Sequence, residues 1–200
     1  AEFAGWEMPI QYNGIIAEHK AVRERVGIFD VSHMGQIFIS GPDTVAFLSY
    51  VTTWDMKRQK DNDCRYCHIL DNDGRIIDDI IAYTFTSEEY MIIPNAATIA
   101  TIFSWLLENS GDFDVHIKNS SNDFFCLALQ GPEAPRLLGQ HLNTSVKPFR
   151  LVRERNTIVS GTGYTGEEGC EIIGPSEEVK GHWESLVDMG AEPVGLGARD

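Results

Sequence analysis

The sequence predicts an α+β fold in which a split-βαβ (ferredoxin-like) unit, residues 51–140, is inserted in a second α+β domain made of residues 1–50 and 141–200. Residues 51–140 carry short strand-like runs and helical patterns in the order strands, helix, strands, helix. Residues 141–200 are similar in pattern to the first fifty. A hydrophobic share of 42% and a charged share of 23% are typical of a globular protein.

In the first fifty residues, apolar side chains recur at helical spacing over residues 14–26, and Gly27 ends the pattern. Residues 28–40 are rich in β-forming residues toward their end, so a strand is expected there. A second helix is predicted from the Gly-Pro-Asp sequence at 41–43 to about Tyr50.

The inserted unit is expected to begin with three short strands joined by turns, one of them at Asp71–Gly74. A helix with an asparagine cap follows over residues 95–109. Two further strands and a helix that opens at Gly131-Pro132 complete it. Beyond residue 147 the pattern predicts a strand, a glycine-rich turn, another strand and an amphipathic helix.

Composition excludes several classes of function. The formal net charge of −14 argues against a general nucleic-acid binder, because the phosphate backbone would repel it. No apolar run approaches the roughly 20 residues that a membrane-spanning helix needs. The cysteines are too few and too scattered for a disulfide scaffold, so free thiols are expected: Cys64, Cys67, Cys126 and Cys170.

The sequence CRYCH at Cys64–His68 matches a haem-attachment string, but it continues like a strand and the cysteine usage predicts a reducing compartment. A zinc site would need a second ligand pair, and a redox pair would need a helix to follow. The DNDG sequence that comes next lacks the ligand spacing of a calcium loop. A plain strand with small apolar cysteines is therefore predicted, with no metal and no haem.

Two adjacent acids stand among isoleucines in RIIDDIIAY, residues 75–83. Strand alternation places Asp79 and Tyr83 on one face and Asp78 on the other. Both faces are aliphatic, which predicts a strand buried on both sides with at least one carboxylate against apolar neighbours. An unpaired buried carboxylate costs several kcal/mol, so the residues leave two interpretations open, a structural partner or a ligand.

Two other candidate groups have ordinary structural interpretations. The glycines of GTGYTGEEGCE, residues 161–171, do not match a dinucleotide loop or a P-loop, and they suit tight turns. Glu171 on the strand that follows is interpreted as a structural edge-strand acid. His33 lies near Asp30 and Ser32, but a catalytic triad usually assembles from separated segments, so a buried, hydrogen-bonded histidine is expected.

In several of these segments the chain resembles the aminomethyltransferase (T-protein) family of the glycine cleavage system, within a folate-binding superfamily. The matching segments occur in family order and span essentially the whole chain: FAGWEMPIQY, HKAVRERVGIFDVSHMG, LDNDGRIIDDIIAY, LALQGPEA, GYTGEEGCEI and GLGARD. The segments GIFDVSHMG, IIDD and GYTGEEG are the most specific.

The resemblance implies a reaction. A lipoylated carrier (H-) protein presents an aminomethyl group bonded to sulfur. The one-carbon unit passes to tetrahydrofolate, ammonia is released, and 5,10-methylenetetrahydrofolate and the dihydrolipoyl carrier remain. The resemblance also implies a folate-binding first domain, an N-terminal fragment that lacks a C-terminal barrel domain, and a cytoplasmic or mitochondrial-matrix location.

Site residues follow from the same resemblance. Asp79 matches the family's catalytic acid, and Tyr83 on the same strand face is expected to line the channel. Glu171 matches the acid that pairs with the amino edge of the pterin, and Tyr164 belongs to the same pocket. Arg199 matches a folate-binding arginine.

The chain departs from the family pattern at Arg75, where a glycine is common, and at Pro94, where a valine is common. Neither change touches the expected site residues. Three alternatives remain. The first is another tetrahydrofolate-dependent enzyme of the demethylase type, or the folate domain of a dimethylglycine- or sarcosine-oxidising enzyme. The others are a non-catalytic folate-binding module and an α+β scaffold without a ligand.

Overall fold

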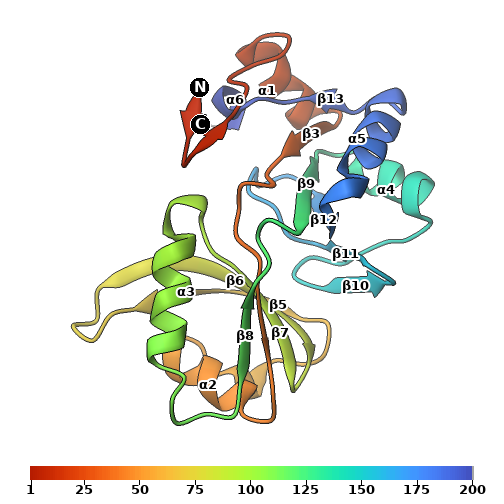
Figure 1. The fold of residues 1–200 in the computed structure, drawn as a ribbon. Coiled ribbons are helices and arrows are strands. Elements are labelled where there is room, and N and C mark those ends of the chain that lie inside the picture. The colour runs from red at the N-terminus through yellow and green to blue at the C-terminus, as the bar shows by residue number, and fades with distance from the viewer. Residues whose placement is uncertain (200) are drawn as a thin grey trace. The chain divides into compact units, whose positions relative to one another are not determined.

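The computed structural model describes residues 1–199, and the chain forms two compact units (Figure 1). The first unit contains Ala1–His33 and the segment from Asp123 onward, and the second contains Met34–Asn122. The α+β class is confirmed. The borders differ from the expected 50/51 and 140/141, because the strand at residues 37–40 pairs within the second unit and the strand at 124–130 pairs within the first.

A six-stranded sheet forms the centre of the first unit. Its strands lie in the order β10-β11-β12-β9-β3-β13, and only β13 runs parallel to its neighbour. The bounds are β3 Gly27–Asp30, β9 Phe124–Gln130, β10 Leu151–Glu154, β11 Thr157–Ser160, β12 Gly169–Pro175 and β13 Glu192–Pro193. A separate two-stranded hairpin precedes it, formed by β1 Glu2–Phe3 and β2 Trp6–Glu7.

Two helices cover one face of this sheet. Leu137 and Leu138 of α4 and Leu186 of α5 pack with Ile28, Leu127 and Ile172 of the strands in one buried cluster. The helices of the unit are α1 Ile15–Glu24, α4 Ala134–Leu142, α5 Val179–Asp188 and α6 Leu196–Arg199, with a 3-10 turn η3 at Ser176–Glu178. The opposite sheet face carries Phe29 and Ala128, which pack against Val22 and Val194.

A buried carboxylate joins three segments of the first unit. Glu18 has no exposed surface, and its Oε1 accepts hydrogen bonds from the backbone N–H groups of Tyr12 (2.6 Å), Asn13 (2.7 Å) and Gly14 (3.0 Å). Its Oε2 accepts another from the N–H of Gly195 (2.9 Å). Burial alone would raise the pKa of Glu18, but these four donors favour the charged form, and the pKa is lowered.

The second unit contains a five-stranded antiparallel sheet in the order β5-β6-β7-β4-β8. The strands are β4 Ile37–Ser40, β5 Cys64–Leu70, β6 Ile76–Thr86, β7 Glu89–Ile93 and β8 His116–Asn119. The helices are α2 Thr44–Val51 and α3 Ile99–Glu108, with 3-10 turns η1 Met56–Arg58 and η2 Ala96–Thr98. Side chains of α2 and α3, among them Phe47 and Leu106, pack on Ile39, Ile80 and Ala82 in one core.

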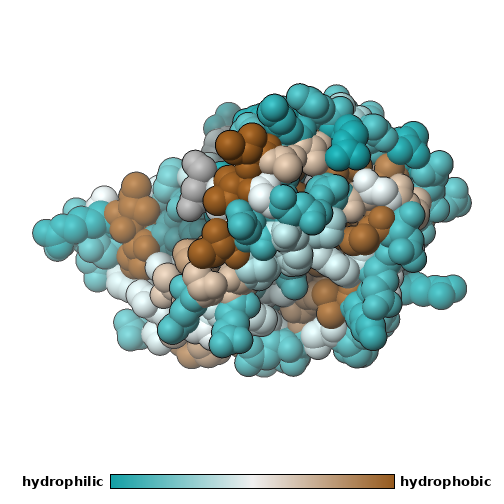
Figure 2. Space-filling view, turned by 90° about the horizontal axis from the view of Figure 1, so that it is seen from above, coloured by the Kyte–Doolittle hydropathy of each residue, from teal (hydrophilic) through white to brown (hydrophobic). Residues whose placement is uncertain are grey.

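Half of the exposed large hydrophobic side chains lie in the first sixteen residues, and these are Phe3, Trp6, Ile10, Tyr12, Ile15 and Ile16. Figure 2 shows groups of hydrophobic side chains among hydrophilic ones on the face seen from above. No helix among residues 1–199 is long and apolar enough to span a bilayer.

Candidate functional site

The adjacent acids of β6 have opposite surroundings. Asp78 is buried, with 6% of its surface exposed, whereas Asp79 is exposed. Asp78 accepts hydrogen bonds from Asn95 N (2.9 Å), Asn95 Nδ2 (2.7 Å) and Thr98 Oγ1 (2.6 Å). These donors begin the segment that leads into α3, so the carboxylate also lies near a helix N-terminus. Asp78 is therefore the buried acid with a structural partner.

The expectation that this strand is buried on both sides is wrong for its first half. Ile76 is 64% exposed, and Asp79 faces solvent, because α2 and α3 cover only the face that carries Asp78, Ile80 and Ala82. The candidate catalytic acid is consequently an accessible carboxylate.

The surroundings of Asp79 come from β5 and from the start of η2. His68 on β5 lies directly opposite Asp79 in the sheet register. Tyr66, two residues earlier on β5, lies diagonally across the strand pair from Asp79. Asn95 donates from Nδ2 to the backbone carbonyl of Asp79 (3.1 Å) and to its Oδ1 (3.3 Å). Sequence reasoning missed Tyr66 and His68, although a two-residue spacing on a neighbouring strand could have suggested a shared face.

Tyr83 lies farther along β6, opposite Cys64 on one side and Met91 on the other. Its side chain is completely buried. The structure thus gives Tyr83 no accessible hydroxyl, and the expectation that it lines an open channel finds no support in this geometry.

Glu171 lies on β12, which pairs with β11 on one side and β9 on the other. The interpretation of Glu171 as an edge-strand acid is wrong, because β12 is an interior strand. Glu171, Ala128 and Phe29 occupy one cross-strand row, on the sheet face that α4 and α5 do not cover. The half-buried carboxylate of Glu171 accepts a hydrogen bond from the hydroxyl of Thr162.

The glycine-rich loop before β12 encloses the side chain of Gln130. The Nε2 of this buried amide contacts the carbonyl oxygens of Thr162 and Cys170 at 3.4 Å, and its Oε1 accepts from Thr165 Oγ1 at 2.8 Å. A Cβ added at Gly163 or Gly169 would lie 2.2 Å from Gln130 Oε1 or 2.5 Å from its Nε2. The loop can close around the amide only because these positions carry no side chain.

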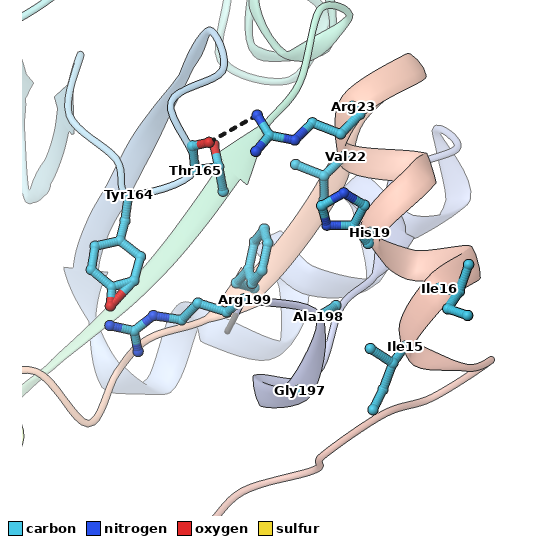
Figure 3. A pocket seen from close by; sticks show the side chains of 11 residues that line it. Ile15, Ile16, His19, Val22, Arg23, Tyr164, Thr165, Gly197, Ala198 and Arg199 are labelled. Carbon is cyan, nitrogen blue, oxygen red and sulfur yellow. Dashed lines mark hydrogen bonds between the residues drawn. The ribbon is translucent and has the colours of Figure 1, made fainter.

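Arg199 and Tyr164 are brought together at a pocket of about 410 Å³ in the first unit (Figure 3). The guanidinium carbon of Arg199 lies 3.6 Å from the centre of the Tyr164 ring, a cation–π contact. On another wall, Arg23 donates to the carbonyl of Thr165 (3.1 Å) and forms an ion pair with Glu167 (2.6 Å). Ile15 and Ile16 add apolar surface, so the pocket combines cationic and hydrophobic walls.

A second pocket of about 270 Å³ shares Arg199 and Phe29 with the first and is lined by Trp6, Tyr12 and His33. His33 is 2% exposed, and neither ring nitrogen has a hydrogen-bond partner within the described chain. The expectation of a buried histidine is correct, but the expectation that it is hydrogen-bonded is wrong. Burial, followed by the charge of Arg199, lowers the pKa of His33, which therefore favours its neutral form.

The cysteines offer no reactive thiol or metal-ligand set. None of the four forms a disulfide, and all are buried. Burial raises the pKa of Cys67 to about 11 and that of Cys170 to about 12, and it raises the pKa of Cys126 well above 9.0. Among residues 1–199 no cluster of three or more histidine, cysteine and acidic side chains is arranged to hold a metal ion.

The geometry can be compared with known proteins. The family model described as "GCVT N-terminal domain" matches residues 1–200. Proteins named aminomethyltransferase from Desulfitobacterium hafniense strain Y51 and Clostridium botulinum strain Okra are 39% and 40% identical over the whole chain. The chain spans 58% and 57% of the length of these curated relatives.

Solved structures agree with this similarity. The glycine cleavage system aminomethyltransferase T from Bartonella henselae superimposes on the whole chain with a TM-score of 0.94 and 33% identity, over 56% of its own chain. A heterotetrameric sarcosine oxidase from Corynebacterium sp. U-96 matches 87% of this chain and 89% of its own, with a TM-score of 0.58. At 14% identity the second likeness shows the fold alone.

Proposed function

Because the chain belongs to the GCVT N-terminal domain family, we propose that the complete protein is an aminomethyltransferase of a glycine cleavage system. It takes the one-carbon unit from the aminomethyl-lipoyl arm of a lipoylated carrier (H-) protein, transfers it to tetrahydrofolate and releases ammonia. The observation that carries the proposal is the agreement of sequence and fold over the whole chain with a glycine cleavage aminomethyltransferase.

Glu171 and Arg199 are the proposed folate-binding groups of the first unit. A half-buried carboxylate on the sheet face opposite α4 and α5 can accept two parallel N–H donors of an aminopyrimidine edge, and such charge-assisted bonds are among the stronger hydrogen bonds. A guanidinium can hold a carboxylate with two parallel hydrogen bonds, so Arg199 suits a negatively charged part of the folate. Tyr164 keeps the Arg199 side chain in place through the ring contact.

Asp79 is the proposed catalytic acid of the second unit. Its carboxylate is exposed, so it can accept a hydrogen bond from a reacting nitrogen and orient that nitrogen toward the carbon it attacks. It can also stabilise positive charge that develops there, without forming a covalent bond. The four buried thiols are not needed as nucleophiles.

Binding is tested by calorimetric titration of tetrahydrofolate, under anaerobic reducing conditions, into the wild-type chain, a Glu171→Ala variant and a Glu168→Ala control. Glu168 is an exposed acid three residues earlier. We expect saturable binding in the wild type and the control and its loss in Glu171→Ala.

Equal binding by all three proteins would overturn the role of Glu171. If none binds, the titration is repeated with the complete protein that carries this chain. Absence of binding there would overturn the proposed function.

A further inference from the structure

Two hydroxyl groups lie next to the carboxylate of Glu171 on one face of the sheet of the first unit. Ser160 on β11 is directly opposite Glu171 on β12 in the antiparallel register. Residues that face each other across a strand pair point to the same side of the sheet, so Ser160 and Glu171 share the face opposite α4 and α5. Thr162 follows Ser160 by two residues, and the two hydroxyl oxygens are 2.6 Å apart.

The direction of the hydrogen bonds follows from the number of protons available. The Thr162 hydroxyl donates its single proton to Oε2 of Glu171. In its contact with Ser160 the Thr162 oxygen is therefore the acceptor, and Ser160 is the donor. The bonds run in one direction, from Ser160 through Thr162 to the carboxylate, and in such a chain each bond polarises the next.

Both hydroxyl groups are shielded from water. Ser160 has no exposed surface and Thr162 is 6% exposed, whereas Glu171 is half-buried. Because water has little access to the Thr162 hydroxyl, solvent competes poorly with the carboxylate for this hydrogen bond. Bonds to charged groups are also stronger than bonds between neutral groups. The carboxylate is therefore restrained before any ligand binds.

The backbone that carries the Thr162 hydroxyl is held by neighbouring segments. Gly161, the residue before it, donates its N–H to the carbonyl of Arg150 (2.8 Å) and accepts from the N–H of Phe149 (2.9 Å). The carbonyl oxygen of Thr162 contacts Nε2 of the buried Gln130 at 3.4 Å. These contacts fix the point from which the hydroxyl reaches Glu171.

We propose that Thr162, oriented by Ser160, is a positioning residue that fixes the plane of the Glu171 carboxylate for two parallel N–H donors of the ligand; this rests on the proposed function. An ionised carboxylate has about four acceptor positions, so a bond from Thr162 to one oxygen is compatible with ligand donors on both. The Thr162 bond reduces the rotational freedom of Glu171 in the unliganded protein. Binding then loses less entropy, and the affinity rises.

The first test is calorimetric titration of tetrahydrofolate, under anaerobic reducing conditions, into the complete protein and its variants. Thr162→Val keeps the shape of the side chain but removes the hydroxyl, and it is expected to weaken binding about tenfold. Thr162→Ser restores the hydroxyl and should bind within about twofold of the wild type. The matched control is Thr157→Val, because Thr157 lies on the same strand but alternates to the opposite sheet face. The control should bind as the wild type does.

Ser160→Ala provides a second variant, which takes the place of Thr162→Val if that protein does not fold. It leaves the bond between Thr162 and Glu171 in place and removes the donor that orients the Thr162 hydroxyl. Binding of tetrahydrofolate should weaken by about threefold, less than in Thr162→Val. Full affinity in Ser160→Ala would overturn the orienting role of Ser160.

Urea unfolding shows whether the contact forms in solution, independently of any ligand. Thr162→Val, Glu171→Ala and the double variant are compared with the wild type. The loss in the unfolding midpoint caused by Thr162→Val should fall to about half or less when Glu171 is already alanine, because the hydroxyl then has no carboxylate to bond. Equal losses in both backgrounds would show that the two side chains do not interact and would overturn the inference.

Ligand selectivity distinguishes positioning from a merely structural role, which would weaken all ligands alike. The probe is a 2-desamino-2-methyl analogue of tetrahydrofolate, which keeps one ring N–H but lacks the exocyclic amine. The wild type should prefer tetrahydrofolate by about tenfold or more. Thr162→Val should reduce this preference several-fold, because an unrestrained carboxylate loses more freedom in meeting two donors than in meeting one. An unchanged preference would overturn the positioning role.

The two proposals fail in different ways. If the wild-type protein binds tetrahydrofolate and Glu171→Ala loses binding while Thr162→Val binds as the wild type does, the inference about Thr162 is wrong and the proposed function stands. If the wild-type complete protein does not bind tetrahydrofolate, both are overturned.

Discussion

Asp78 and Asp79 are neighbours in the sequence, yet one carboxylate is buried against Asn95 and Thr98 and the other faces solvent. The burial of Asp78 depends on the donors that satisfy it, so its contribution belongs to stability. The exposure of Asp79 leaves its oxygen atoms accessible, as the catalytic role proposed for it requires.

This contrast predicts opposite phenotypes for two adjacent substitutions. Asp78→Ala should lower the free energy of unfolding by about 2–4 kcal/mol, because three partly buried donors lose their buried acceptor. Asp79→Ala should change it by less than about 1 kcal/mol and abolish transfer in the complete protein. Urea unfolding and a turnover assay measure both effects. A large loss of stability in Asp79→Ala would contradict this assignment.

Among the acidic residues of the first unit, Glu18 should cause the largest loss in the free energy of unfolding when it is replaced. Glu18→Ala leaves four backbone N–H groups without their acceptor, so the free energy of unfolding should fall by about 3–5 kcal/mol. Glu18→Gln keeps one acceptor oxygen and should lose less. Chemical denaturation checks the order of the two variants. An exposed acid on the same helix, Glu24, serves as the control, and its replacement by alanine should have little effect.

The stability of the chain should decrease in mildly acidic solution. Burial lowers the pKa of His33, His141 and His182 below the ordinary value of 6.5, and the His182 ring adds to the effect on His141. The unfolded chain therefore binds more protons around this pH, and the free energy of unfolding falls as pH decreases through 6.5. Denaturant unfolding at several values between about pH 7.5 and about pH 5.5 measures the slope.

A variant that removes one of these groups separates their contributions. His33→Gln should reduce the pH slope, because it removes one of the three groups that take up a proton on unfolding. His141 and His182, whose Nε2 and Nδ1 atoms are 2.8 Å apart, remain. A slope identical to that of the wild type would show that His33 is solvated in the folded state.

The thiols should be inert while the chain is folded. With a pKa of about 11 for Cys67 and about 12 for Cys170, little thiolate exists at mildly alkaline pH, and burial also excludes reagents. A disulfide reagent that reports free thiols should react very slowly with the native chain and quickly with all four cysteines in concentrated guanidinium. Rapid reaction of one thiol in the native chain would identify an opening that the structure does not show.

Local patterns in the sequence were enough to predict the main elements. The string CRYCHIL forms β5, as its strand-like continuation indicates, and the turn at Asp71–Gly74 is closed by the bond from Gly74 N to Asp71 O. The helix expected over residues 95–109 begins as a 3-10 turn and continues as α3. These features depend on residues close together in the chain.

Features that depend on distant residues could not be predicted in this way. Alternation separates Asp78 from Asp79 but does not show which face α2 and α3 will cover. The interior position of Glu171 depends on β9, which lies about forty residues earlier in the chain. The lack of a hydrogen bond at either ring nitrogen of His33 depends on distant residues, because the ring packs against Phe3 and lines a pocket together with Arg199. Strand order and the filling of space between segments decide all three.

The loop that carries Tyr164 folds closely around the side-chain amide of Gln130. The backbone of the loop follows the outline of a side chain from another strand, so Gly163, Gly169 and Gln130 constrain one another's substitution. A methyl group at Gly163 should be harmful beside glutamine and far better tolerated beside alanine at position 130, a dependence that a double-mutant cycle would measure. The effects of substitutions at Gly163, Gly169 and Gln130 on stability should therefore depend on one another, so a redesign of this loop should change the three positions together.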